Sequence, residues 1–291
     1  MRRRGSPRFE PLVVGIGFCG VAYLLVLGRM TTVPTRPRIV LLGDSLTQLS
    51  FGEGGWGAAV ANRYQRRCDV LNRGYSGYNS RWILELVERG EIETGTLTTV
   101  FLGANDASLE AHNARQHVPL AEFEANLKAI LKKTPGPAVL IAPPPVDHAQ
   151  RLEYQKQRYP NSATGVLERT NESAGRYAEA CERVAKERRV PCLNLWSLMQ
   201  LHHDWPTFLI DGLHLSPKGN QFVATHLLDV IARRFPYLAV TPDPRTGYAG
   251  TSASISDLKP HAPWHDVIDR TNFKRAFDEA HFTSSSSSSS S

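Results

Sequence analysis

A serine, an aspartate and a histidine stand where they could form a nucleophile and its base. Ser45 follows the apolar run Ile39–Leu42 closely, and Asp211 and His214 are three residues apart in the motif DGLH. A serine hydroxyl attacks a carbonyl carbon readily only when a base accepts its proton, and that base works best when a third group orients it. In a tight turn Asp211 could bond Nδ1 of His214, which would leave Nε2 for Ser45. This set of residues suits acyl transfer.

Two further positions could stabilise the oxyanion that forms in such a reaction. Gly74 follows the apolar run Asp69–Leu71, and Asn105 follows the run Thr99–Leu102. A backbone N–H and a side-chain amide are the kinds of donor that an oxyanion hole uses. Each residue alone also has an ordinary structural explanation, since a serine often caps a helix and a glycine often permits a turn. The combination, in this order and at these strand ends, indicates acyl transfer.

The elements that must position these residues follow from the pattern of apolar runs. The runs are bounded by Gly, Pro, Asn or Asp, which is typical of buried strands, and the segments between them have helical spacing. This alternation predicts an α/β fold with a parallel sheet covered by helices on both faces. Reactive groups gather at the carboxyl ends of such strands. The predicted strands are Ile39–Leu42, Asp69–Leu71, Thr99–Leu102, Ala138–Ala142 and Pro191–Leu195.

Residues 1–37 predict a basic targeting or anchoring segment followed by a linker. Residues 12–27, LVVGIGFCGVAYLLVL, carry no charge and follow several arginines. They are fewer than the roughly 20 residues that span a bilayer comfortably, so a signal peptide or a short signal anchor fits. No small-x-small cleavage site stands out after Leu27. We expect a single-pass membrane anchor with the domain in the lumen or outside the cell, and a secreted or organellar protein after cleavage is the alternative.

The positive charge of the chain does not indicate nucleic-acid binding. The formal net charge is +6, and residues 1–38 alone hold seven arginines and one acid. The remainder is balanced, so we expect no nucleic-acid partner. The cysteines form no C-x-x-C pair, and LHHDW at residues 201–205 lacks the H-E-x-x-H spacing. We therefore expect no metal site and interpret the cysteines as small apolar residues of the core.

The strand and helix patterns end near residue 235. Residues 236–283 contain several prolines and no sustained period, which predicts an irregular extension. The chain ends in eight serines at residues 284–291, a tract that cannot form a core and is expected to be disordered. We therefore predict one catalytic domain over residues 38–235.

Together the motifs resemble the SGNH or GDSL hydrolase superfamily. Its four blocks match GDSL at 43–46, NRGYSG at 72–77, GAND at 103–106 and DGLH at 211–214. Longer strings resemble the isoamyl acetate-hydrolysing esterase group and plant GDSL esterases; they are GWGAAVANRYQRRCDVLNRGYSGYNSRW, FLGANDA, QHVPLAEFEANL, ERTNESAGRYAEAC and DGLHLSPKGN. The resemblance covers about residues 38–235 and implies a flavodoxin-like three-layer α/β/α sandwich with a parallel sheet.

The resemblance also implies a role for each motif residue. Ser45 is expected to be the nucleophile, His214 its base, and Asp211 the residue that orients the base. The N–H groups of Ser45 and Gly74 and the amide of Asn105 are expected to form the oxyanion hole. No cofactor is implied, and the expected partner is a small-molecule ester.

Two residues near the nucleophile are expected to line the substrate pocket. Asp44 precedes Ser45, and Trp56 follows the glycines of FGEGGWG. Those glycines lack the spacing of a dinucleotide fingerprint and the lysine of a P-loop, so a phosphate site is not predicted. We expect them to form a mobile rim beside Trp56.

The expected activity is that of a serine esterase which forms an acyl-enzyme on Ser45 and hydrolyses small or short-acyl carboxylic esters. The same site could instead act as an acyltransferase, or as a deacylase of lipid or carbohydrate esters. A third alternative is a catalytically silent binding protein tethered to a membrane through residues 12–27. The complete set of Ser, Gly, Asn, Asp and His argues against it, because a binding protein has no need of all five.

Overall fold

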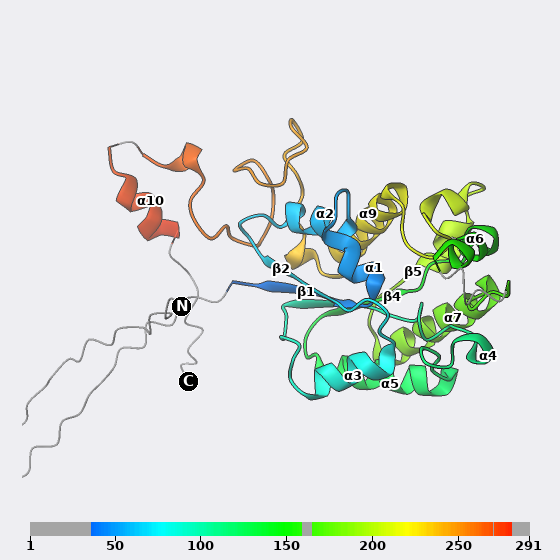
Figure 1. Ribbon diagram of the computed structural model, residues 1–291. Coiled ribbons are helices and arrows are strands. Elements are labelled where there is room, and N and C mark those ends of the chain that lie inside the picture. The colour runs from blue at the N-terminus through cyan, green and yellow to red at the C-terminus, as the bar shows by residue number, and fades with distance from the viewer. Residues whose placement is uncertain (1–35, 159–164, 270, 281–291) are drawn as a thin grey trace, which may run out of the picture. The chain divides into compact units, whose positions relative to one another are not determined.

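Five short apolar segments form one parallel sheet, as the sequence predicts (Figure 1). Along the first strand Val40, Leu41 and Leu42 are completely buried, as expected of a strand with helices on both faces. The strands lie in the order β2-β1-β3-β4-β5, and each neighbouring pair is parallel. Their bounds are β1 Arg38–Gly43, β2 Asp69–Gly74, β3 Leu97–Phe101, β4 Ala138–Ala142 and β5 Cys192–Asn194.

The structure is a computed structural model that describes residues 36–158, 165–269 and 271–280. The predicted anchor at residues 12–27 and the serine tail at 284–291 lie outside the described residues. Within the part of the chain that is described, no helix is both long enough and apolar enough to cross a membrane. Membrane attachment and localisation therefore stay predictions.

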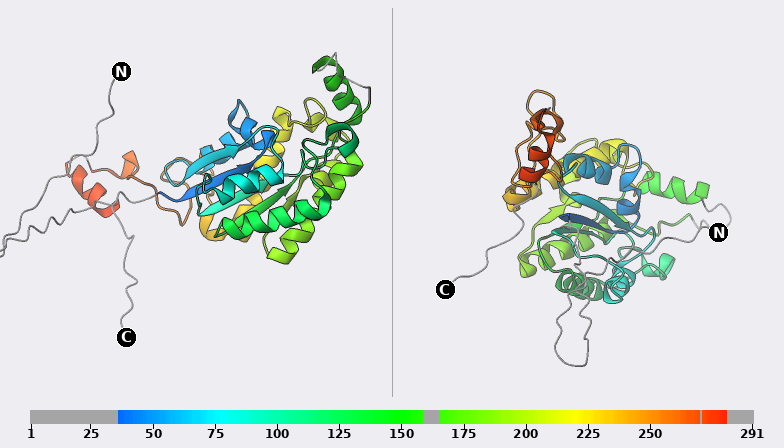
Figure 2. Two further views of the ribbon diagram at one scale, coloured as in Figure 1. Left: turned by 60° about the horizontal axis from the view of Figure 1, so that its bottom comes forward. Right: turned by 90° about the vertical axis from the view of Figure 1, so that its left-hand side faces the viewer.

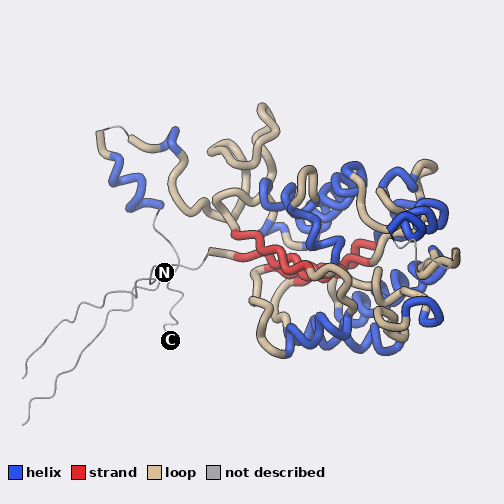
Figure 3. Tube along the Cα trace, in the orientation of Figure 1, coloured by secondary structure: helices blue, strands red, loops and turns tan. Residues whose placement is uncertain are grey.

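Helices cover both faces of the sheet and enclose two apolar cores (Figures 1 and 2). Their bounds are α1 Ser45–Gln48, α2 Trp56–Arg63, α3 Ser80–Glu88, α4 Glu110–Asn113, α5 Leu120–Lys133, α6 His148–Arg158, α7 Asn171–Arg188, α8 Leu195–Gln200, α9 Pro217–Arg234 and α10 Phe273–Ala280. On one face α5 packs between α3 and α7, and on the other α2 packs against α9. The strands lie between these layers (Figure 3), which confirms the predicted three-layer α/β/α fold.

The register of the sheet brings the predicted site residues to one edge. Gly43 at the end of β1 pairs with Gly74 at the end of β2 and with Phe101 at the end of β3. Because the strands are parallel, the segments that follow these ends leave the sheet on the same side. Ser45 and Asn105 lie in two of those segments.

The described part of the segment after α9, from residue 235 onward, is mostly irregular (Figure 3). It nevertheless contacts the domain. Its described part contains 3-10 turns at Pro236–Leu238 and His265–Val267, and also α10, which the sequence analysis does not predict. Shortly after α2, the guanidinium of Arg66 lies 4.1 Å from the centre of the Trp264 ring. This contact attaches the extension to the domain just after the C-terminal end of α2.

Candidate active site

The turn after β1 presents Ser45 at the start of α1. Asp44 caps this helix, because its Oδ1 accepts the Leu46 N–H at 2.9 Å and its carbonyl accepts the N–H groups of Thr47 and Gln48. Among the described residues no hydrogen bond occupies the Ser45 N–H, the first of the turn, so it can donate to a ligand. Ser45 is therefore not the helix cap, and its hydroxyl is free for other contacts.

Ser45 forms a hydrogen-bonded chain with two residues of DGLH. Its Oγ lies 2.9 Å from Nε2 of His214, and Nδ1 of His214 lies 2.7 Å from Oδ2 of Asp211. Oδ1 of Asp211 accepts the backbone N–H groups of Leu213 at 3.0 Å and of His214 at 2.7 Å. An imidazole held by a carboxylate in this way carries its hydrogen on Nδ1, so Nε2 can accept the serine proton. The structure thus brings together the predicted nucleophile, base and orienting acid.

Gly212 lets the loop between Asp211 and His214 pack closely against α6. Its φ is +79°, a conformation that favours glycine. A Cβ atom there would lie 2.4 Å from the backbone nitrogen of Arg151 in α6. The carbonyl of Gly212 also accepts the N–H of Asp147, just before α6, at 3.0 Å. The glycine of DGLH therefore allows the loop to approach the helix.

The surroundings of Asp211 keep its carboxylate charged. Burial by itself raises the pKa of this carboxyl group. The hydrogen bond and charge of His214, together with the N–H groups of His214 and Leu213, outweigh that effect and lower the pKa to about 2. The side chain is 12% exposed. A charged carboxylate at this place stabilises the imidazolium that forms when His214 accepts a proton.

The amide of Asn105 is oriented by residues that the sequence analysis does not single out. Its Oδ1 accepts Nη2 of Arg169 at 2.9 Å and Nε2 of Gln116 at 3.1 Å. Its Nδ2 donates to the Tyr78 carbonyl at 2.9 Å and lies 3.4 Å from Oδ2 of Asp44. The second contact is long for a hydrogen bond. One amide hydrogen therefore remains weakly held and suits the role predicted for Asn105.

Gly74 lies against α1 at the predicted strand end, but its N–H already has a partner. That N–H donates to Oδ1 of Asn72 at 2.9 Å, and Nδ2 of Asn72 donates to the Thr47 carbonyl at 2.9 Å. A Cβ atom at Gly74 would lie 2.0 Å from the backbone nitrogen of Gln48, so this close approach requires glycine. Gly74 contributes to an oxyanion hole here only if it shares its hydrogen with Asn72.

The prediction that Asp44 and Trp56 line the substrate pocket is wrong. Both are completely buried, and neither is among the described residues that line the cavity beside Ser45. The Trp56 indole N–H donates to the Leu46 carbonyl at 2.8 Å, so the ring supports the turn of the nucleophile from within the core. Asp44 caps that turn instead of facing the cavity. The two residues are near Ser45 in the chain but point into the protein.

Asp44 nevertheless gives the site a group that titrates near neutral pH. Burial raises the pKa of Asp44 to about 7, although the hydrogen bond from the Leu46 N–H and the charge of His214 lower it. The carboxyl group lies beside the amide of Asn105 at 3.4 Å. Its protonation therefore changes the electrostatic surroundings of the predicted oxyanion donor.

The cavity beside Ser45 has a volume of about 690 Å³ and mixes aromatic with polar side chains. Ser45, Asn105 and His214 all line it. The rings of Tyr78 and Trp82 meet edge to face, with centroids 5.5 Å apart. Other side chains of its wall are Arg115, Gln116, Tyr154 and Gln155. Such a wall offers several hydrogen-bonding groups to a bound molecule.

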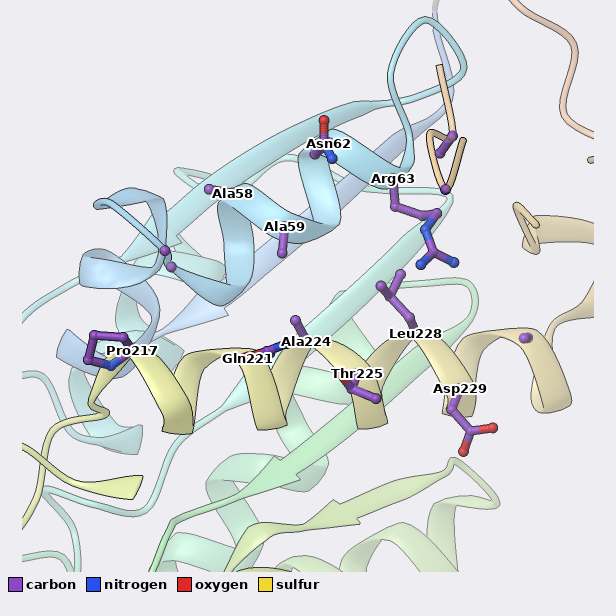
Figure 4. A pocket seen from close by; sticks show the side chains of 15 residues that line it. Ala58, Ala59, Asn62, Arg63, Pro217, Gln221, Ala224, Thr225, Leu228 and Asp229 are labelled. Atoms are coloured by element: carbon purple, nitrogen blue, oxygen red, sulfur yellow. The ribbon is translucent and has the colours of Figure 1, made fainter. Parts of the chain in front are cut away.

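A second cavity, of about 880 Å³, lies between α2 and α9 (Figure 4). Ala224 and Leu228 of α9 point toward α2, which contributes Ala58 and Ala59 to the wall. Gly54 and Gly55 of the predicted rim belong to this cavity and not to the one beside Ser45. None of its described lining residues is a serine, cysteine or histidine. The cavity beside Ser45 is therefore the candidate active site.

The polar residues of LHHDW contact different partners. His202 packs edge-on against the rings of Phe208 and Phe222, at centroid distances of 5.4 and 5.5 Å, and Asp204 forms an ion pair with Lys218. Over the described ranges, no group of three or more His, Cys, Asp or Glu side chains is placed to hold a metal ion. That the protein works without a metal or cofactor stays a prediction.

Comparisons with known proteins find relatives along most of the chain. The family model described as GDSL-like Lipase/Acylhydrolase matches residues 39–227. A GDSL esterase/lipase of Arabidopsis thaliana is 41% identical over 255 residues, which cover 84% of this chain and 98% of the relative. The isoamyl acetate-hydrolyzing esterase 1 homolog of Bos taurus is 44% identical over 210 residues, which cover 68% of this chain and 82% of the relative.

Solved structures share the fold at lower sequence identity. A lipase/acylhydrolase from Enterococcus faecalis has a TM-score of 0.53 and 24% identity, with 68% of this chain and 96% of that chain covered. The acetylxylan esterase Axe2 from Geobacillus stearothermophilus has a TM-score of 0.50 and 17% identity, with 68% and 95% covered. At these identities the likeness concerns the fold, a parallel sheet flanked by helices.

Proposed function

Because this chain belongs to the GDSL-like lipase/acylhydrolase family and is a GDSL-type esterase, we propose that it hydrolyses small or short-acyl carboxylic esters through an acyl-enzyme on Ser45. The observation that carries the proposal is the chain from Ser45 Oγ to His214 at 2.9 Å and from His214 to Asp211 at 2.7 Å. It pairs a nucleophile with an oriented base. The names of the isoamyl acetate-hydrolyzing relatives support the choice of a small ester.

In the proposed reaction, Oγ of Ser45 attacks the carbonyl carbon while Nε2 of His214 accepts the hydroxyl proton. The Ser45 N–H and the Asn105 amide donate to the oxyanion. His214 then donates its proton to the departing alkoxide, and the alcohol leaves. Water attacks the acyl-serine with His214 again as base, and collapse of the second intermediate releases the acid and restores Ser45. Asp211 stays charged and stabilises the imidazolium in both halves.

The lining of the cavity favours one second candidate, removal of a short acyl group from a carbohydrate ester. The aromatic rings of Trp82 and Tyr154 line the cavity, and His112 and Arg115 bring polar side chains to the same wall. Sugar rings present both C–H faces and hydroxyl groups, so they match this mixture better than a long alkyl chain does.

The test measures hydrolysis of p-nitrophenyl acetate, butyrate and octanoate by the full chain and by Ser45→Ala. We expect rates that fall with acyl length and vanish in the variant. Acetate release from isoamyl acetate and from an acetylated xylose then compares the two candidates directly. Rates that rise toward octanoate contradict a short acyl group, and equal rates with and without Ser45 contradict the acyl-enzyme.

A further inference from the structure

A buried carboxylate, Glu168, lies between two guanidinium groups in the wall of the active-site cavity. Its Oε1 accepts Nε of Arg151 at 2.8 Å and Nη1 of Arg169 at 2.7 Å. The exposed fractions of Arg151, Glu168 and Arg169 are 5%, 9% and 4%. Charged side chains are rarely so deeply buried, and a buried ion-pair cluster often adds no more stability than apolar residues would. A role in the site would explain why the cluster is there.

Each guanidinium reaches one half of the proposed catalytic machinery. Nη1 of Arg151 lies 3.6 Å from Oδ2 of Asp211, the same oxygen that bonds Nδ1 of His214 at 2.7 Å. Nη2 of Arg169 donates to Oδ1 of Asn105 at 2.9 Å. The carboxylate between the two cations thus connects the acid of the triad with the oxyanion amide.

Arg169 is held by more than this one carboxylate. Its Nε donates to the Ala104 carbonyl at 3.0 Å, and its Nη2 also donates to Oε1 of Gln116 at 2.6 Å. Nε2 of Gln116 in turn donates to Oδ1 of Asn105 at 3.1 Å. The Asn105 oxygen therefore has two fixed donors, which fix the orientation of its amide.

We propose that Glu168 is a positioning residue. Through Arg151 and Arg169 it holds the general base and the oxyanion donor at fixed positions relative to each other. The inference rests on the proposed serine esterase reaction. Without the negative charge of Glu168, the two guanidinium groups repel each other, and Asp211 and Asn105 lose partners that are fixed in place. A displacement of about 1 Å at a catalytic group is enough to slow a reaction by about 100-fold.

The experiment compares Glu168→Gln and Arg151→Gln with Glu187→Gln, a substitution of an exposed carboxylate on α7 that pairs with Lys128. On p-nitrophenyl acetate we expect Glu168→Gln to lower kcat by about 10- to 100-fold with little change in KM. We expect Glu187→Gln to change neither. Arg151→Gln should also lower kcat with little change in KM, because it removes the contact between Arg151 and Asp211.

Active-site labelling separates this inference from the proposed function. A fluorophosphonate should label the full wild-type chain at Ser45, and no labelling of the wild type would refute the esterase mechanism itself. Labelling of Glu168→Gln should be slower by the same factor as kcat. Equal labelling rates in Glu168→Gln and in the wild type overturn the positioning role and leave the esterase mechanism standing.

A second variant keeps the test decisive if loss of the buried charge prevents folding. Arg169→Lys keeps the positive charge but lacks the planar fork that contacts Glu168 and Asn105. It is measured alone and together with Asn105→Ala. If Arg169 acts through Asn105, its substitution lowers kcat when Asn105 is present and has little effect when Asn105 is absent. Fully additive losses overturn the proposal.

Discussion

Asp44→Asn should make the stability of the protein less dependent on pH. Asp44 is completely buried, and burial raises its pKa from 3.8 to about 7. Between these values the native state binds more protons than the unfolded state, so this group makes the free energy of unfolding fall as pH rises. From pH 5 to pH 8 the loss due to Asp44 is about 2–3 kcal/mol. Asparagine removes the titration and still offers an oxygen to the Leu46 N–H.

Urea unfolding of the wild type and of Asp44→Asn at pH 5, 6, 7 and 8 measures this loss. Asp106, whose pKa burial raises to about 6 although Ser80 bonds to it, contributes to the slope in the same direction in both proteins. Asp229→Asn on α9, with a side chain 49% exposed, is the matched control and should follow the wild type. Parallel curves for Asp44→Asn and the wild type would refute the reasoning, because a buried titrating carboxylate cannot leave the slope unchanged.

Three further substitutions test the site. Asn105→Ala should lower kcat on p-nitrophenyl acetate by about 10²–10³ with little effect on KM, as measured by steady-state kinetics, because an oxyanion donor acts in the transition state. Gly212→Ala should lower the free energy of unfolding by more than about 1 kcal/mol, as measured in urea, because φ is positive and the Cβ would meet Arg151. Trp56→Phe should lower the free energy of unfolding by about 1 kcal/mol or more, because the hydrogen bond to the Leu46 carbonyl is lost, and should leave KM unchanged. A raised KM would show that Trp56 contacts the substrate after all.

The strands could be predicted because strands buried on both faces are short continuous apolar runs in the sequence. The run Ala138–Ala142 is observed as β4 with the predicted bounds. The run predicted at Thr99–Leu102 is observed as β3 at Leu97–Phe101, since its backbone pairing with β1 begins at Leu97. The polar residues Thr98 and Thr99 interrupt the apolar pattern near the start of β3. A pattern of apolar residues does not show where backbone pairing begins.

The triad could be predicted because its members are either close in the chain or at strand ends. Asp211 and His214 share one turn, and Ser45 lies two positions after the end of β1. The hydrogen bond of the Gly74 N–H could not be predicted, because it depends on the conformation of the Asn72 side chain, whose Oδ1 accepts that N–H. The interpretation of Trp56 failed for a related reason, since nearness in the chain does not say which way a side chain points.

The cluster of Arg151, Glu168 and Arg169 shows most clearly what the sequence does not reveal. Arg151 lies in α6, and Glu168 and Arg169 precede α7, so no spacing rule relates them to Asp211 or Asn105. In the sequence they read as ordinary polar residues of a surface. Only their burial and their contacts show two cations around one carboxylate. Since such a cluster is costly to bury and apolar residues often stabilise a core as well, its contacts with both halves of the site favour the positioning role that we propose.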